Sequence, residues 1–134
     1  MVMKGLDKPV LIDTSVWVDY FRKKGEAYHK VNELINSRNA CCLSLIIAEL
    51  IQGASTEREI DVITDLTQVF PQLEESPDSW EKAGFLSFHL RKSGKKIGLA
   101  DCYIATVAKE NNAAIYTFDK HFEEIKKHAE ITLL

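Results

Sequence analysis

The chain has 134 residues, of which 46% are hydrophobic and 28% are charged, a composition typical of a soluble globular protein. That length suits one domain with a single core, and we expect residues 1–134 to form it. The formal net charge of −3 disfavours a protein that coats nucleic acid through bulk charge, but it does not exclude an enzyme that handles a phosphodiester with a bound metal.

No apolar run is long enough to span a membrane, and residues 1–8 lack the apolar centre of a signal peptide. The three cysteines, Cys41, Cys42 and Cys102, are an odd number and fit neither a disulfide framework nor a zinc-binding spacing. We therefore expect a cytoplasmic protein whose cysteines are small buried apolar residues.

The first predicted strand is the apolar run 10–12, which leads directly into Asp13. A continuous run of this kind is typical of a strand buried on both faces. Thr14 and Ser15 supply side-chain oxygens that can cap a following helix. Asp13 therefore stands at the carboxyl end of a buried strand, where open α/β sheets bind ligands. The alternative is that Asp13 only turns the chain or caps the helix.

Helices at 15–21 and 26–36 and a strand at 40–43 precede a predicted helix at 45–53. This last helix has almost no polar face, so we expect it to be buried. Glu49 lies in its middle, and a buried carboxylate is costly unless something pairs with it. No Lys or Arg is nearby in the sequence, so the partner must come from the tertiary fold. A salt bridge, a protonated carboxyl and a metal ion are the alternatives, and we favour a functional role.

The second half of the chain continues to alternate helices with short strands, which favours an α/β fold with a mainly parallel sheet. Asp101 shares a helix face with Ile104 and Ala108, so it should face inward. Asp119 directly follows a predicted strand and thus repeats the pattern of Asp13. The expected elements are an amphipathic helix at 56–70, an edge strand at 71–73, a helix that begins near 76 and ends at 91–94, a helix at 99–108, a strand at 113–118, a helix at 121–127 and a strand at 131–134.

Four of the 20 acidic residues stand out by context: Asp13, Glu49, Asp101 and Asp119. If the strands before the first and last of them are neighbours, both side chains project from one sheet edge, which the two helices can also reach. Four carboxylates close together need a counter-charge, and ligands that are all oxygen select Mg²⁺ or Mn²⁺. Such a site can activate water and neutralise charge in phosphoryl chemistry.

No histidine lies among these four acids in the sequence, which argues against zinc. We interpret all four histidines as surface or otherwise satisfied residues: His29, His89, His121 and His128.

The stretches that contain the four acids resemble a PIN-domain ribonuclease of the VapC toxin type. They are LIDTSVWVDYF, SLIIAELIQG, IGLADCYIATVA and IYTFDKHFEEI. The resemblance implies an α/β/α sandwich with three layers and an acidic pocket for one or two Mg²⁺ or Mn²⁺ ions. In that pocket the core acids would be Asp13, Glu49 and Asp101, Asp119 would complete the site, and hydroxyls would orient the carboxylates or bind solvent. The implied hydroxyl residues are Thr14 or Ser15, and Thr117.

The same resemblance implies endonucleolytic cleavage of RNA, a homodimer, and inhibition by a VapB-type antitoxin whose C-terminal segment enters the acidic groove. The densest basic cluster lies just before Asp101 and could contact phosphates that flank the scissile bond. The alternative interpretation of this cluster is a solvated loop with cations at a helix end. The same two interpretations apply to a second basic cluster at 22–24. The first cluster consists of Arg91, Lys92, Lys95 and Lys96.

Other classes fit less well. A haloacid-dehalogenase-type phosphatase needs a second Asp two residues after the first, where this chain has Ser15. A response-regulator receiver needs an acidic pair, an acceptor Asp and a distal Lys that we cannot place. A housekeeping RNA-processing nuclease of the same fold, and a non-catalytic PIN-fold interaction module, stay as alternatives.

Overall fold

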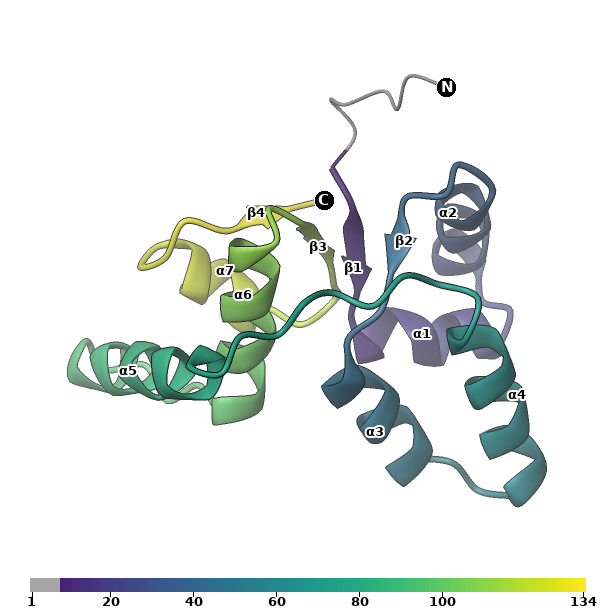
Figure 1. Ribbon diagram of the computed structural model, residues 1–134, viewed down its shortest axis with the longest axis horizontal. Coiled ribbons are helices and arrows are strands. Elements are labelled where there is room, and N and C mark those ends of the chain that lie inside the picture. The colour runs from purple at the N-terminus through teal and green to yellow at the C-terminus, as the bar shows by residue number, and fades with distance from the viewer. Residues whose placement is uncertain (1–7) are drawn as a thin grey trace.

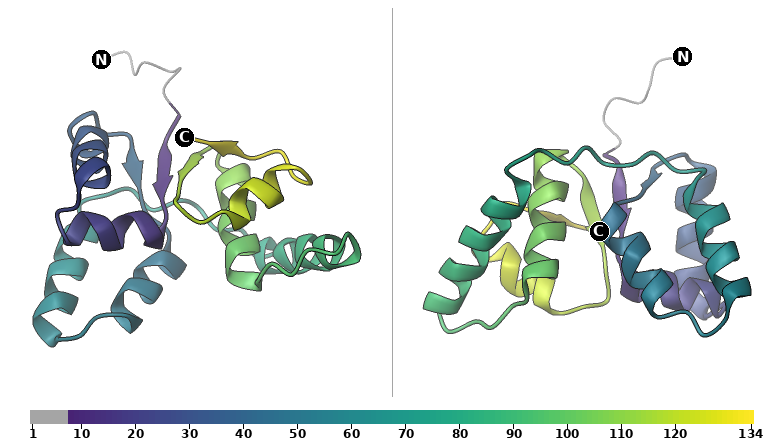
Figure 2. Two further views of the ribbon diagram at one scale, coloured as in Figure 1. Left: turned by 180° about the vertical axis from the view of Figure 1, so that it is seen from behind. Right: turned by 60° about the horizontal axis from the view of Figure 1, so that its bottom comes forward.

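The computed structural model describes residues 8–134 as one parallel sheet with helices on both sides (Figures 1 and 2). The strands are β1 (Val10–Ile12), β2 (Ala40–Cys41), β3 (Ala114–Tyr116) and β4 (Thr132–Leu133), in the spatial order β2-β1-β3-β4. The helices are α1 (Thr14–Phe21), α2 (Gly25–Asn36), α3 (Ser44–Gln52), α4 (Glu57–Thr67), α5 (Ser79–Lys92), α6 (Leu99–Glu110) and α7 (His121–Lys126). The three-layer α/β/α fold predicted from the sequence is confirmed. Residues 1–7, which hold most of the segment considered for a signal peptide, lie outside the described part.

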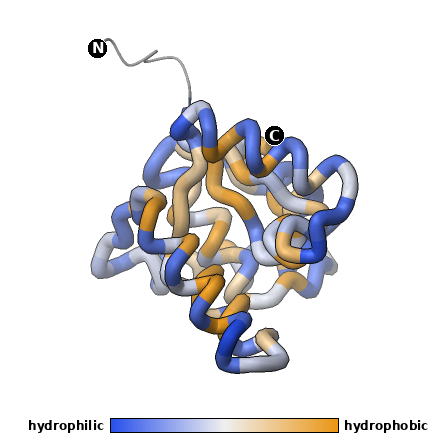
Figure 3. The backbone as a smooth tube through the Cα atoms, turned by 90° about the vertical axis from the view of Figure 1, so that its right-hand side faces the viewer, coloured by the Kyte–Doolittle hydropathy of each residue, from blue (hydrophilic) through white to orange (hydrophobic). Residues whose placement is uncertain are grey.

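The centre of the sheet is β1, which pairs in parallel with β2 on one side and with β3 on the other. Leu11 lies opposite Cys41 in one neighbour and Ile115 in the other, and all three side chains are buried. Helices α1 and α2 lie on one side of the sheet, and α6 with α5 lies on the other. Because both faces are covered at the centre of the sheet, β1 and β3 are buried along their whole length rather than alternating, and hydrophobic colour follows the central strands in Figure 3.

The edge strand expected at 71–73 reduces to a single parallel bridge between Gln72 and Cys42. All three cysteines are buried and free, as predicted. Among residues 8–134, no helix combines the length and the apolar character needed to cross a bilayer.

The expectation that the third helix is buried on all sides is wrong. Within α3 only Ile46 and Leu50 are buried, whereas Leu45, Ile47 and Ile51 are partly exposed. The physical reason is its position, because α1 and α4 are the main elements that pack against it and its outer side has no cover within residues 8–134. Glu49 is accordingly half-buried instead of fully enclosed.

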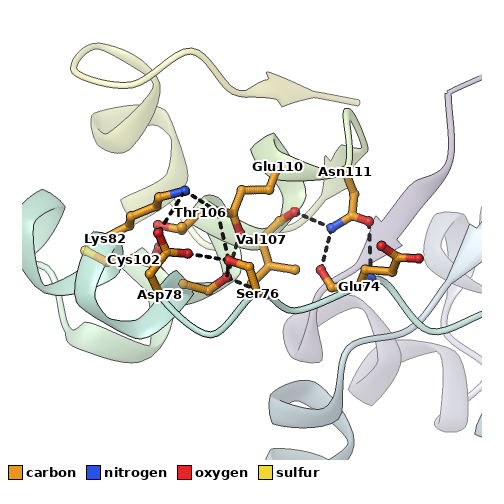
Figure 4. Close-up of polar contacts among 10 residues, drawn as sticks. Glu74, Ser76, Asp78, Lys82, Cys102, Thr106, Val107, Glu110 and Asn111 are labelled. Carbon is orange, nitrogen blue, oxygen red and sulfur yellow. Dashed lines mark hydrogen bonds and ion pairs between the residues drawn. The ribbon is translucent and has the colours of Figure 1, made fainter.

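Helix α5 begins at Ser79, two residues after the first helical residue predicted, which was Pro77 with Ser76 as its cap. The Ser76 hydroxyl contacts Asp78 at 2.7 Å and the Ser79 hydroxyl at 2.8 Å, while Ser79 donates to Glu110 at the end of α6 at 2.6 Å (Figure 4). Lys82 adds an ion pair with Glu110 at 2.8 Å. This polar cluster fixes the start of α5 against the end of α6 and so positions the helix that carries Asp101.

Candidate functional site

The site lies where the chain changes direction across the sheet. After β1 the chain moves to β2 on one side, whereas β3 lies on the other side of β1, so the carboxyl ends of β1 and β3 flank a topological switch point. Asp13 is the first residue after β1, and its N–H donates to the carbonyl of Tyr116 in β3 at 2.9 Å. The Asp13 side chain is 5% exposed. The predicted adjacency of the segments that follow these two strands is therefore found in the structure.

Two hydroxyls hold the Asp13 carboxylate. Thr117 donates to Oδ2 of Asp13 at 2.7 Å, and Ser15 donates to the same oxygen at 3.1 Å. Each hydroxyl also accepts a backbone N–H from the segment after β3, Thr117 from Asp119 at 3.0 Å and Ser15 from Phe118 at 3.0 Å. The hydroxyls thus tie the turn after β3 to the start of α1 and orient the Asp13 carboxylate between them.

Glu49 reaches the same edge from α3. Thr14 donates to Oε1 of Glu49 at 2.7 Å, so two consecutive residues after Asp13 each hold a different carboxylate. Burial raises the pKa of the Glu49 carboxyl; the Thr14 hydrogen bond opposes this rise, and the nearby charges of Asp13 and Asp101 add to it.

Asp101 lies in the first turn of α6 and is partly exposed. Burial raises its pKa, the contact with His121 lowers it, and the charges of Asp119 and Asp13 raise it further. The charge of Asp101 also raises the pKa of Glu49, so Asp101 lies near enough to interact electrostatically with Asp13, Glu49 and Asp119. The structure therefore brings the four predicted carboxylates close together at one sheet edge.

One histidine also reaches these acids, which the sequence reading did not anticipate. His121 is exposed, as expected, but its Nδ1 lies 3.0 Å from Oδ2 of Asp101 and 3.6 Å from Oδ1 of Asp119. Its backbone N–H also donates to Oδ1 of Asp119 at 2.9 Å. The hydrogen bond to Asp101 and the charge of Asp119 raise the pKa of the imidazole. The available signal was the position of His121 at the start of a helix two residues after a candidate acid.

The donor atoms at this edge suit a divalent cation. Within residues 8–134, one group of three side chains places its ligand atoms within 4.8 Å of one another, namely Asp101, Asp119 and His121. Asp13 and Glu49 are held instead by hydroxyls, and their side-chain hydrogen bonds within the described chain engage only Oδ2 and Oε1. Carboxylate oxygens crowded together in this way favour a bound cation because mutual repulsion otherwise opposes their ionisation.

The basic cluster before Asp101 is divided between two environments. Lys95 makes an ion pair with Glu124 in α7 at 3.2 Å. Arg91 and Lys92 lie over the ring of Phe88, at 5.7 and 5.6 Å from its centroid. Arg91, Lys92 and Lys96 are exposed, so their charges face solvent beside the start of α6.

The PIN domain family model matches residues 10–128, which cover all of these elements except β4. Among curated relatives, Ribonuclease VapC1 of Methanocaldococcus jannaschii is 30% identical over 90% of this chain and 84% of its own. Ribonuclease VapC11 of Mycobacterium tuberculosis is 31% identical over 88% of this chain and 92% of its own. The chain belongs to the PIN domain family, within its VapC branch.

Solved structures agree on the fold. DNA-bound VapBC from Salmonella typhimurium contains a chain that superposes with a TM-score of 0.76 at 21% identity and covers 95% of this chain and 97% of its own. VapBC2 from Rickettsia felis, bound to a promoter DNA fragment, gives a TM-score of 0.72 at 22% identity over 93% and 96%. At these identities the likeness establishes the shared architecture and nothing finer.

Proposed function

We propose that this chain is a metal-dependent endoribonuclease that acts as the toxin of a type II toxin–antitoxin pair. The observation that carries this proposal is the convergence of Asp13, Glu49, Asp101 and Asp119 at the switch point of the sheet. Two of these acids have raised pKa values because burial and neighbouring carboxylates disfavour their charged forms. A site that gathers repelling charges at a cost to the fold is typical of catalysis rather than of structural support.

In this proposal the four acids hold Mg²⁺ or Mn²⁺, which supplies an activated water and neutralises charge at the phosphodiester. The chain's own groups fix the ligands. Thr117 and Ser15 fix Asp13, and Thr14 fixes Glu49, so the carboxylates keep their positions when substrate enters. The cleavage itself needs no nucleophile from the protein, because the metal would supply the activated water.

The exposed cations beside α6 are the proposed contacts for RNA phosphates. Arg91, Lys92 and Lys96 are free to bind a flanking phosphate, whereas Lys95 must first leave Glu124. Phe88 lies beneath Arg91 and Lys92 and is 43% exposed, so it adds an aromatic face to the same surface. Cations with an exposed ring are a common combination on proteins that bind single-stranded nucleic acid.

The proposed protein partner is a VapB-type antitoxin, because the structures of similar fold are described as VapBC complexes. A pocket of about 400 Å³ between α1, α3 and α4, lined by apolar and charged side chains, offers room for side chains of an amphipathic partner segment. Val18, Phe21, Leu50 and Ile63 are among its lining residues. Family membership also supports a homodimer and an action in the cytoplasm.

The test is cleavage of a total-RNA pool and of a circular RNA by purified protein in Mg²⁺, in Mn²⁺ and in EDTA. The wild type is compared with Asp13→Asn and with Asp65→Asn, a matched change at an exposed position of α4 away from the site. We expect discrete fragments and an opened circle from the wild type and from Asp65→Asn, and none with EDTA or with Asp13→Asn.

Equal cleavage by Asp13→Asn would trace the activity to a contaminant and remove the proposed site. No cleavage by folded protein that is free of antitoxin would favour the non-catalytic interaction module instead. Sequencing the ends of discrete fragments would separate a toxin that cuts one RNA from a nuclease that trims precursors.

A further inference from the structure

The carboxylates at the sheet edge are held in two different ways. Asp13 and Glu49 accept hydrogen bonds from hydroxyls, which are neutral donors. Asp101 and Asp119 instead face one imidazole nitrogen, Nδ1 of His121, at 3.0 and 3.6 Å. The second side of the site is therefore a mixed nitrogen and oxygen donor set, unlike the all-carboxylate set that the sequence predicts.

The spacing of these three donors fits a common metal ion. Neighbouring ligands at about 2.1 Å from an octahedral ion lie about 3 Å apart, and opposite ligands lie about 4 Å apart. The observed separations of 3.0 and 3.6 Å, with all three donors within 4.8 Å, lie in or close to that range. The backbone N–H of His121 also donates to Oδ1 of Asp119 at 2.9 Å, which keeps the Asp119 carboxylate beside the start of α7.

An ion pair alone does not account well for this arrangement. His121 is about half exposed, and exposed pairs add little to stability. An imidazole nitrogen binds transition metals much better than it binds Mg²⁺, which prefers oxygen. A histidine between two candidate metal ligands therefore changes which cation the site selects.

We propose that His121 is a metal ligand together with Asp101 and Asp119, and that its nitrogen makes this side of the site prefer Mn²⁺ to Mg²⁺. The inference rests on the proposed metal dependence of the site. Asp101 is the acid shared between this side and the side of Asp13 and Glu49, so it couples the two sides electrostatically. The Mn²⁺-preferring position is the one beside α7.

The test measures Mn²⁺ binding to the full chain by the electron paramagnetic resonance signal of free Mn²⁺, and Mg²⁺ binding by competition. His121→Gln is compared with the wild type and with His128→Gln, a matched change at an exposed histidine outside the site. We expect His121→Gln to weaken Mn²⁺ binding about tenfold or more while Mg²⁺ binding changes less than about threefold, because the lost ligand is nitrogen. His128→Gln should match the wild type.

A second measurement needs no variant. In protein labelled with ¹⁵N at histidine, substoichiometric Mn²⁺ should broaden the ring signals of His121 before those of His89 and His128. Equal losses of Mn²⁺ and Mg²⁺ affinity in His121→Gln, or no loss, would overturn the inference, as would unbroadened His121 signals. RNA cleavage by the wild type is measured separately. Cleavage without a metal contact at His121 would overturn only this inference, whereas metal binding at His121 without cleavage would overturn only the proposed nuclease activity.

Discussion

The hydroxyl of Thr117 allows a quantitative test of how the site is built. Its Oγ1 makes two short hydrogen bonds, one to the carboxylate of Asp13 at 2.7 Å and one from the N–H of Asp119 at 3.0 Å, and a longer contact with the Ser15 hydroxyl at 3.5 Å. A hydrogen bond to a charged group contributes about 1.5–3 kcal/mol and one between neutral groups about 0.5–1.5 kcal/mol. Ser15 still donates to Asp13 when Thr117 is changed, and the contact is only partly buried. We therefore take the lower ends and expect Thr117→Val to lower the free energy of unfolding by about 2 kcal/mol.

The assay is urea unfolding at pH 7 in EDTA, which removes the contribution of any bound cation. With a denaturant slope of about 2 kcal/mol per molar, the midpoint should fall by about 1 M. Thr117→Ser keeps the hydroxyl and should lose about 1 kcal/mol or less. In a double-mutant cycle, Asp13→Asn and Thr117→Val should couple by about 1 kcal/mol. A Thr117→Val protein as stable as the wild type, or a coupling of zero, would refute the reasoning.

Two further predictions concern charge. Burial raises the pKa of the Glu49 carboxyl, so the folded protein binds the carboxyl proton more tightly than the unfolded chain does. The stability that this difference contributes is complete at acid pH and is lost as the pH rises through the pKa of the folded state. Glu49→Gln should therefore be more stable than the wild type at pH 7 in EDTA, and the difference in urea midpoint should vanish near about pH 4; a difference that does not change with pH would contradict this. The second prediction uses an Asp13→Asn background, which keeps the RNA intact during binding measurements. In this background, Arg91→Ala combined with Lys92→Ala should reduce the slope of log affinity for RNA against log salt concentration by about 0.7 for each lost phosphate contact. Arg58→Ala, a change at an exposed arginine of α4, should leave this slope unchanged. An unaltered slope in the double variant would place the RNA elsewhere.

Local pattern was sufficient to predict the strands that carry the site. The apolar run before Asp13 is a buried strand that ends directly at the carboxylate, as predicted, whereas β3 ends at Tyr116, so the strand predicted to reach Phe118 is two residues too long and Asp119 lies in the turn after it. The mainly parallel sheet followed from the alternation of elements, whereas the adjacency of β1 and β3 was only a condition of the argument, which the structure meets. Asp101 was located because it interrupts an apolar helix face.

The features that the sequence did not reveal depend on contacts between distant segments. His121 meets Asp101 across 20 residues, and no spacing rule connects a helix start with the first turn of another helix. The helix α3 reads as buried from its apolar residues, but burial depends on how many neighbours pack against it, and α1 and α4 cover only part of its surface. Ser76 resembles a helix cap in the sequence, but its hydroxyl is engaged by Asp78, Ser79 and Glu110 in the folded chain.

The pairing of β1 with β3 has a consequence for the order in which the chain is made. Asp13 is synthesised early, yet the hydroxyl that holds it belongs to Thr117, 104 residues later, and reaches it only when β3 inserts beside β1. While the segment that contains Thr117 is still inside the ribosome, Asp101 and Asp119 are either not yet made or not yet placed beside Asp13. The site therefore cannot be complete before the segment that holds Thr117 and Asp119 has been made and has packed beside β1.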